Sequence, residues 1–175
     1  MLADMLTLCL LRHAKSSWDD ASIEDFDRPL APRGEEAAPR MGAYMAAQGI
    51  EPELILCSPA TRARQTLALV VAKLAGQPSV EFEEGLYLAS SSALLARIRK
   101  VRANTHCLML VGHDPGMHGL AVELSGKGNA EDLNRLASKF PTAGLAVISF
   151  RVSQWSQVKP KAGRLDLFMA PRRLS

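Results

Sequence analysis

Basic side chains and histidines follow three apolar segments of the sequence. Arg12 and His13 come directly after the first segment, Arg62 lies shortly after the second, and His113 follows the third. If the three segments are neighbouring parallel strands, the four side chains meet beyond the carboxyl ends of the strands, where open α/β sheets bind their ligands. Guanidinium and imidazole groups in one pocket repel each other unless an anion lies between them. The pattern therefore predicts a site for a dianionic phosphoryl group.

Each of these groups has a defined use in phosphoryl transfer. Guanidinium groups bind phosphate oxygens in bidentate fashion, and the N-terminus of the helix that carries Arg62 adds backbone N–H donors. A neutral imidazole is a nucleophile near pH 7, so one of the two histidines can accept the phosphoryl group covalently. The other histidine would then stabilise the equatorial oxygens by hydrogen bonding. The residue types thus favour a phosphatase that uses histidine chemistry.

Short apolar segments alternate with amphipathic segments along the chain, and this alternation predicts the elements that position the site. The predicted strands are Thr7–Leu11, Leu54–Cys57, Val80–Glu83, Leu108–Val111, Ala146–Val152 and, as an edge strand, Leu165–Met169. The predicted helices are Pro59–Ala75, Ser91–Val101 and Glu35–Gln48, in which Pro39 is expected to cause a kink or to move the helix start. Nearly continuous apolarity is typical of strands buried on both faces of a parallel sheet. We expect a three-layer α/β/α sandwich with a mostly parallel central sheet and an antiparallel edge strand.

The size and composition of the chain fit one α/β domain over residues 1–175. Of its 175 residues, 47% are apolar, and no apolar run approaches the roughly 20 residues of a membrane helix. The polar segment 125–144 is expected to be an insertion or lid with a short helix. The net charge is +3, and the cations are scattered, with the densest group at residues 97–102 expected on a solvent-exposed helix face. We therefore expect no nucleic-acid partner.

The three cysteines lie inside apolar segments and are expected to be buried free thiols. They are Cys9, Cys57 and Cys107, and no Cys-x-x-C motif occurs. The start of the sequence lacks a basic leader, and its apolar stretch runs directly into Arg12 and His13. We expect the protein to reside in the reducing environment of the cytoplasm.

Three motifs resemble those of the histidine phosphatase superfamily, which is also called the phosphoglycerate-mutase-like fold. Leu11-Arg12-His13-Ala14 resembles the Arg-His-Gly signature, residues 58–66 resemble the second motif, and residues 111–116 resemble the third. Weaker similarities at Arg28-Pro29-Leu30, Arg33-Gly34 and Phe140-Pro141-Thr142 extend the resemblance over about residues 7–174. The short chain and the string Gly-His-Asp-Pro-Gly are most similar to the SixA-type phosphohistidine phosphatases.

The resemblance implies a role for each of the four basic residues. His13 would be the nucleophile that becomes phosphorylated, Arg12 and Arg62 would hold the phosphoryl oxygens, and His113 would complete the site. The resemblance implies neither a metal nor another cofactor. Ala14 stands where the family usually has glycine, a change that we expect the backbone to tolerate.

The proton donor for the leaving group is less clearly marked. Members of the superfamily that act on phosphomonoesters typically place a Glu or Asp after the third strand, which makes Glu84 the predicted catalytic acid and Glu83 its alternative. Asp19, Asp20 and Asp25 are further candidates, and a solvated strand end explains the two glutamates equally well. An alkoxide leaving group needs such an acid, whereas a protonated imidazole leaves as a neutral ring. The lack of an obvious donor therefore favours a phosphoramidate substrate.

These observations predict a metal-independent phosphatase that forms a covalent phosphohistidine and acts on phosphohistidine in a protein. The alternative is a phosphomonoesterase acting on a small sugar or nucleotide phosphate. Lys15 and Ser17 are predicted to add contacts to the substrate. Two other classes remain open: a metal-dependent phosphoesterase built on His113, Asp114 and His118, and a phosphate-binding module without catalysis. The sequence leaves the oligomeric state open, and we favour a monomer.

Overall fold

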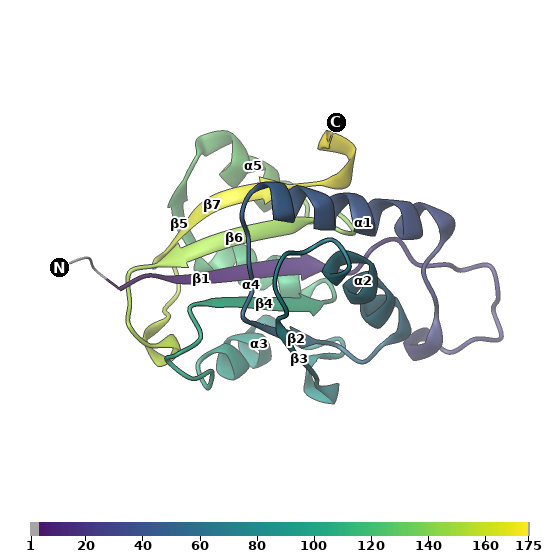
Figure 1. Ribbon diagram of the computed structural model, residues 1–175, viewed down its shortest axis with the longest axis horizontal. Coiled ribbons are helices and arrows are strands. Elements are labelled where there is room, and N and C mark those ends of the chain that lie inside the picture. Colours follow the sequence, from purple (N-terminus) through teal and green to yellow (C-terminus); the bar gives the residue numbers. More distant parts are fainter. Residues whose placement is uncertain (1–3, 175) are drawn as a thin grey trace.

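The computed structural model describes residues 4–174 and shows one mixed sheet between two layers of helices (Figure 1). The strands are β1 (Leu6–Arg12), β2 (Leu54–Cys57), β3 (Ser79–Phe82), β4 (Cys107–Gly112), β5 (Ser125–Gly128), β6 (Leu145–Phe150) and β7 (Gly163–Met169). The α-helices within the described residues are α1 (Pro32–Ala47), α2 (Thr61–Val71), α3 (Ser91–Ile98), α4 (Gly116–Leu124) and α5 (Ala130–Ser138). Short 3₁₀ helices include η1 (Asp25–Asp27), η2 (Glu84–Leu86) and η4 (Pro171–Arg173).

The strand order in the sheet is β3-β2-β4-β1-β6-β7-β5. All neighbouring pairs are parallel except the two that involve β6, which runs antiparallel to both β1 and β7. The predicted mostly parallel α/β sheet is confirmed, but the antiparallel strand lies inside the sheet and not at its edge. The connection from β6 to β7 contains no α-helix within the described residues, so it returns the chain beside β6 in the opposite direction.

The edge position beyond β7 is taken by β5, whose sequence Ser-Gly-Lys-Gly carries no apolar pattern. The expectation of an insertion or lid over 125–144 is therefore wrong for its first four residues, which belong to the sheet. Glycine is needed here because the backbones are close: a Cβ atom on Gly126 would lie 1.8 Å from the Lys161 carbonyl oxygen. The remainder of the segment contains α5, as the expected short helix.

Successive side chains of the central strands face opposite helix layers, which confirms the three-layer sandwich. Leu8 and Leu10 of β1 belong to a core that includes side chains of α3, α4 and α5. Cys9 and Leu11 of the same strand belong to a core formed with α1 and α2. Burial on both faces explains why the strand reads as an uninterrupted apolar run.

Several predicted boundaries shift in the structure. Helix α1 begins at Pro32, where proline occupies the first turn, and it continues through Pro39. Helix α2 ends at Val71 and α3 at Ile98, earlier than the spacing of apolar residues predicts. All four residues of β3 are exposed because β3 forms the other edge of the sheet.

The cysteines are free thiols, with Cys9 and Cys57 buried and Cys107 half-buried. Burial raises the pKa of the Cys57 thiol to about 12, so this thiol is inert at neutral pH. Among residues 4–174, no helix is long and apolar enough to cross a membrane.

The carboxyl ends of three parallel strands lie at the same level. Arg12 at the end of β1 is paired in register with Gly112 of β4, and Cys57 at the end of β2 is paired with Val111. The ladder continues one residue further, because the backbone N–H of His13 donates to the Gly112 carbonyl over 3.0 Å. This register brings the residues that follow the three strands to one edge of the sheet.

Close packing of α1 on α2 fixes the position of α2, the helix that carries Arg62. A substitution at Gly42 of α1 tests this packing. A Cβ atom on Gly42 would lie 2.7 Å from the Val70 carbonyl oxygen of α2. We expect Gly42→Ala to lower the free energy of unfolding by about 2 kcal/mol because the helices must separate. The control is Gly119→Ala in α4, where the nearest atom is Ser91 Cβ at 3.5 Å. The free energy of unfolding of both variants is measured by urea denaturation, and we expect that of the control to rise by about 0.5 kcal/mol because alanine has a higher helix propensity than glycine. Equal changes in the two variants would contradict the packing argument.

Candidate active site

A small pocket of about 200 Å³ opens at the carboxyl ends of β1, β2 and β4. We call it the strand-end pocket, and its lining residues are Arg12, His13, Lys15, Ser16, Trp18, Arg28, Arg62, Leu88, His113, Asp114 and Thr142. The four basic residues singled out in the sequence therefore line one cavity. The rings of His13 and His113 are neighbours, with centroids 5.1 Å apart.

His13 is held in a single orientation by the backbone. Its Nδ1 lies 2.7 Å from the carbonyl oxygen of Ala14. Because a carbonyl oxygen only accepts hydrogen bonds, Nδ1 carries the ring proton. The Nε2 atom then bears the lone pair. The ring is buried, with 7% of the residue exposed, so a neutral nucleophilic nitrogen lies in a pocket largely shielded from water.

The segment after His13 is tied to α2 through Thr66. The backbone N–H of Ala14 donates to Thr66 Oγ1 over 2.9 Å, and the Thr66 hydroxyl donates to the Arg62 carbonyl oxygen over 2.7 Å. Ala14 is fully buried and lies outside the left-handed backbone region. Alanine in place of the family's usual glycine therefore costs no backbone strain. The contact through Thr66 links the positions of His13 and Arg62.

The tautomer of His113 is set by Ser58. The Ser58 hydroxyl accepts a hydrogen bond from the Ala60 backbone N–H and lies 2.7 Å from His113 Nε2. Among the described residues, His113 Nε2 is the one acceptor within hydrogen-bond distance of the Ser58 hydroxyl, so we assign the hydroxyl proton to this bond. The ring proton of a neutral His113 is then on Nδ1. This nitrogen is available to donate a hydrogen bond to an anionic oxygen.

Asp25 of η1 organises one side of the pocket. Its backbone carbonyl and Oδ2 accept hydrogen bonds from Arg62 over 2.6 and 3.0 Å, and its Oδ1 accepts from Arg28 over 3.1 and 3.2 Å. The Tyr87 hydroxyl donates to the same carboxylate. Arg28 also donates to Ser16 Oγ over 2.7 Å, and its guanidinium stacks on the Trp18 ring at 3.5 Å. One carboxylate thus connects η1, α2 and the residue after η2.

The same contacts determine the protonation states. The hydrogen bond from Tyr87, together with Arg62 and Arg28, lowers the pKa of Asp25 to about 2, so this carboxyl holds no proton to donate at neutral pH. Burial lowers the pKa of His13 to about 3, with further lowering by His113, Arg62 and Arg12. Burial and Arg62 lower the pKa of His113 to about 4. Both rings are therefore neutral at pH 7.

Three nitrogens around the pocket are buried without a hydrogen-bond partner among the described residues. They are Arg12 Nε, Arg62 Nε and His113 Nδ1. Burying an unpaired N–H group costs about 1–3 kcal/mol, and more when the group is charged. An anion with several oxygens, such as a phosphoryl group, is the ligand that satisfies such a set. Nothing in the sequence pattern alone shows that these nitrogens lack protein partners.

The remaining predicted site residues differ in position. Lys15 lines the pocket with an exposed side chain, whereas Ser17 does not line it and its hydroxyl accepts a hydrogen bond from the Asp19 backbone. Ser16 lines the pocket in place of Ser17. Glu84 is exposed on η2 and lies outside the pocket lining, and Glu83 is paired with Arg97 at 2.7 Å. The structure therefore does not bring either glutamate to the pocket.

Several functional contacts were missed at the level of sequence. Arg28 and Ser58 belong to segments that the resemblance singled out, yet neither was assigned to the site. Tyr87 contacts the site through Asp25, and its ring packs edge-on against His113 at 5.4 Å. Thr142, in the segment before β6, lines the pocket. The Arg28-Pro29-Leu30 similarity was the one available signal for Arg28.

His118, a candidate metal ligand, is engaged elsewhere, because its Nε2 contacts the Leu136 carbonyl oxygen. Asp114 accepts a hydrogen bond from the His118 backbone and lies 3.5 Å from Arg12, and burial raises the pKa of its carboxyl. Within residues 4–174, no three His, Cys, Asp or Glu side chains are grouped as ligands for a metal ion.

Comparisons with known proteins agree with this geometry. Residues 8–87 match the sequence profile described as Histidine phosphatase superfamily (branch 1). A protein of Mycobacterium tuberculosis described as uncharacterized is 38% identical over 164 residues, which cover 93% of this chain and 100% of the relative. A chloroplastic protein of Arabidopsis thaliana is 32% identical over 94% of this chain and 77% of its own length.

Solved structures show the same likeness. A candidate phosphohistidine phosphatase SixA from Agrobacterium tumefaciens superposes with a TM-score of 0.78 at 33% identity, covering 95% of this chain and 98% of that chain. A second such protein, from Nakamurella multipartitia, gives 0.79 at 29% identity, with coverage of 97% and 98%. The profile match, the identity along nearly the whole chain and the shared fold show that this protein belongs to branch 1 of the histidine phosphatase superfamily.

Proposed function

We propose that the protein is a metal-independent phosphatase that transfers a phosphoryl group to His13 and then to water. The observation that carries the proposal is the state of the His13 ring: the Ala14 carbonyl holds the proton on Nδ1, and the lowered pKa, about 3, keeps Nε2 unprotonated at pH 7. A fixed, neutral imidazole in a pocket with two arginines is suited to attack phosphorus.

The neighbouring groups stabilise the charge that develops on the phosphoryl oxygens. Arg12 and Arg62 present buried Nε–H groups without protein partners, and His113 presents Nδ1–H. Asp25 anchors the Arg62 guanidinium through two other nitrogens, so the orientation of this group is set before the substrate binds. Preorganised donors of this kind act most strongly when they are shielded from water.

The reaction has two steps. In the first, the Nε2 lone pair of His13 forms a bond to phosphorus, and the bond between phosphorus and the leaving group breaks with its electron pair going to the leaving group, which takes up a proton from solvent. In the second, water attacks phosphorus and the electron pair of the bond to Nε2 returns to that nitrogen. Phosphate is released with neutral His13, and one proton of the attacking water returns to solvent. Arg12, Arg62 and His113 bind the same oxygens in both steps.

We infer that the favoured substrate is phosphohistidine in a protein. Among the described residues, Asp114 is the one carboxyl in the pocket lining. Burial raises its pKa, but Arg12 at 3.5 Å and the His118 backbone N–H stabilise its charged form, which cannot donate a proton. A phosphorylated imidazole places less demand on a general acid than an alkoxide does. The names of the SixA-type structural neighbours support the same substrate class. A cytoplasmic location, where free thiols persist, remains part of this proposal.

Replacing the nucleophile tests the covalent step. We expect His13→Ala to lower kcat at least about 10³-fold because the first step loses its acceptor. With a ³²P-labelled phosphohistidine substrate, rapid quenching should trap an acid-labile, alkali-stable label on the parent protein and none on the variant. The matched control is His106→Ala, which removes an exposed histidine paired with Glu53.

The control variant should retain both turnover and the label, also after dialysis against EDTA. Full activity of His13→Ala would refute the assigned nucleophile. Loss of activity on chelation would instead support a metal-dependent enzyme.

The lowered histidine pKa values predict an unusual pH profile. Because both rings stay neutral until the pH falls toward 4, we expect kcat/KM, divided by the fraction of the substrate present as the dianion, to be nearly constant from pH 7 down to about pH 5. Arg62→Gln removes a positive charge that lowers both pKa values, so the acidic limb of the profile should move to higher pH. Initial rates are measured across this range and corrected for spontaneous hydrolysis. A limb near pH 6.5 in the parent protein would show that the rings are not perturbed.

Parallel assays separate the two substrate classes. We expect kcat/KM for a phosphohistidine peptide to exceed that for sugar phosphates and nucleoside monophosphates by about 10²-fold or more, which is the contribution of a positioned acid that the monoesters require. Glu84→Gln provides a control, since the exposed Glu84 lies outside the pocket and its loss should change neither rate. Faster hydrolysis of a monoester would assign the protein to the alternative class.

A further inference from the structure

A second, larger hollow of about 1010 Å³ lies beside the strand-end pocket. It is bordered by α1, by the end of α5 with the loop that follows it, and by the C-terminal segment around η4. The two cavities share Arg12, Lys15 and Thr142 in their linings. A ligand that fills the larger cavity, which we call the basic groove, can therefore extend to the point where the phosphoryl group would lie.

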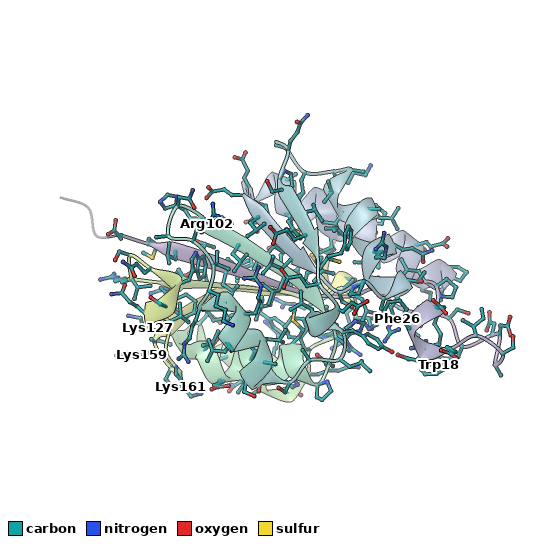
Figure 2. All side chains as sticks on the ribbon, turned by 90° about the horizontal axis from the view of Figure 1, so that it is seen from below. Trp18, Phe26, Arg102, Lys127, Lys159 and Lys161 are labelled. Atoms are coloured by element: carbon teal, nitrogen blue, oxygen red, sulfur yellow. The ribbon has the colours of Figure 1, made fainter. Side chains whose placement is uncertain are left out.

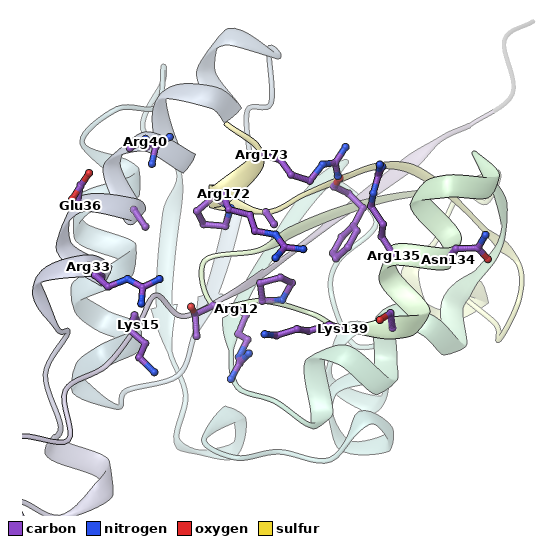
Figure 3. A pocket seen from close by; sticks show the side chains of 17 residues that line it. Arg12, Lys15, Arg33, Glu36, Arg40, Asn134, Arg135, Lys139, Arg172 and Arg173 are labelled. Carbon is purple, nitrogen blue, oxygen red and sulfur yellow. The ribbon is translucent and has the colours of Figure 1, made fainter. Parts of the chain in front are cut away.

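The groove concentrates positive charge. Besides the two shared cations, its lining contains six more: Arg33, Arg40, Arg135, Lys139, Arg172 and Arg173. The lining contains one carboxylate among the described residues, Glu36, and Figure 3 shows it turned away from the space into which Arg33, Lys139 and Arg172 point. The whole chain has a net charge of only +3, so the groove is far more basic than the surface as a whole.

Several of these cations are not neutralised within the protein. Arg135 pairs with Glu131 and Asp132 at 3.6 and 3.5 Å. In contrast, no carboxylate among the described residues forms an ion pair with Arg33, Lys139 or Arg172. These three side chains come from three different elements and reach toward one space (Figure 3). Clustered like charges destabilise the isolated protein, which is a cost that an anionic partner removes.

We propose that the basic groove binds an acidic segment of the phosphorylated substrate protein and thereby selects the substrate. This inference deepens the proposed function and rests on it for the identity of the phosphorylated residue. The groove binds carboxylates that flank this residue, while the strand-end pocket receives the phosphoryl group. Binding in the groove would stabilise the substrate complex and the transition state equally, which lowers KM and leaves kcat unchanged.

The lining of the groove favours an acidic protein segment over other anions. Pockets for small molecules are mostly apolar and enclosed, whereas this cavity is lined by cations from separate elements. Single-stranded nucleic acids rely on exposed aromatic side chains for stacking. Phe168 is the one aromatic residue in the described lining, and it is buried, with 4% exposed. Cationic side chains without an exposed aromatic side chain beside them are suited to carboxylates, which bind through ion pairs and need no stacking.

Two phosphohistidine peptides of equal length test the proposal. One carries Asp and Glu around the phosphohistidine and the other carries Ser and Asn. We expect the acidic peptide to have a KM roughly tenfold lower at low ionic strength, since a few exposed ion pairs are worth this factor together. The triple variant R33Q/K139Q/R172Q should abolish this difference while kcat and the turnover of free phosphohistidine stay unchanged.

A matched triple variant controls for the loss of overall charge. Arg102, Lys127 and Lys159 are exposed and lie at the end of the molecule opposite Trp18 and Phe26 (Figure 2). R102Q/K127Q/K159Q removes the same number of charges and should preserve the preference for the acidic peptide. Equal KM values for the two peptides with the parent protein, or equal effects of the two triple variants, would overturn the proposal.

Measuring the binding of an acidic peptide without phosphate tests the groove independently of the proposed phosphatase activity. The anisotropy of a fluorescein-labelled acidic peptide without phosphate should report binding that weakens roughly tenfold in R33Q/K139Q/R172Q and falls with added salt. This result would support the groove even if phosphohistidine were not turned over, in which case only the substrate assignment fails. No binding of the acidic peptide, or displacement by an oligonucleotide at far lower concentration than by unlabelled acidic peptide, would overturn the proposal, the latter in favour of nucleic acid.

Discussion

Repulsion among positive groups in one buried pocket is the constraint on which the rest of the site depends. Burial lowers the pKa of the two imidazole rings in the pocket, and the neighbouring Arg62 and Arg12 guanidinium groups lower it further, so both rings stay neutral. A neutral His13 is the form that the proposed mechanism requires for attack on phosphorus. The arrangement that makes the empty pocket electrostatically unfavourable therefore also keeps the proposed nucleophile uncharged and would favour an incoming dianion.

The surrounding structure makes this arrangement tolerable. Asp25 supplies a carboxylate to both Arg62 and Arg28, and its pKa of about 2 shows that it is stabilised in the charged form. This carboxylate neutralises charge at the back of the guanidinium groups, away from the Arg62 Nε that lacks a partner. Backbone hydrogen bonds position His13 relative to both β4 and the segment before β6, since its N–H donates to Gly112 and its carbonyl accepts from Ala143. The sheet thus positions the site, and Asp25 of η1 balances part of its charge.

Much of the fold and the centre of the site could be predicted from the sequence because both follow from local patterns. Buried strands appear as apolar runs, and residues after parallel strands converge at one sheet edge, which placed Arg12, His13 and His113 together. Strand β5 was missed because its role depends on close backbone approach at Gly126 and not on apolar side chains. Asp25 was considered only as a proton donor, since its partners Arg62 and Tyr87 are distant in sequence. The exposure of Glu84 likewise depends on tertiary structure.

The positive charges of the groove also could not be predicted from the sequence, because residues that are far apart along the chain lie close together in the folded protein. Cations that are scattered along the chain suggested no collective role in the sequence. Folding brings residues of α1, of the loop after α5 and of the C-terminal segment to one groove, while Arg172 and Arg173 remain exposed. A pocket of about 200 Å³ has room for a phosphoryl group and little more. Recognition of a larger substrate must therefore come from surfaces outside it, and the groove is the adjoining surface whose charge complements an acidic protein.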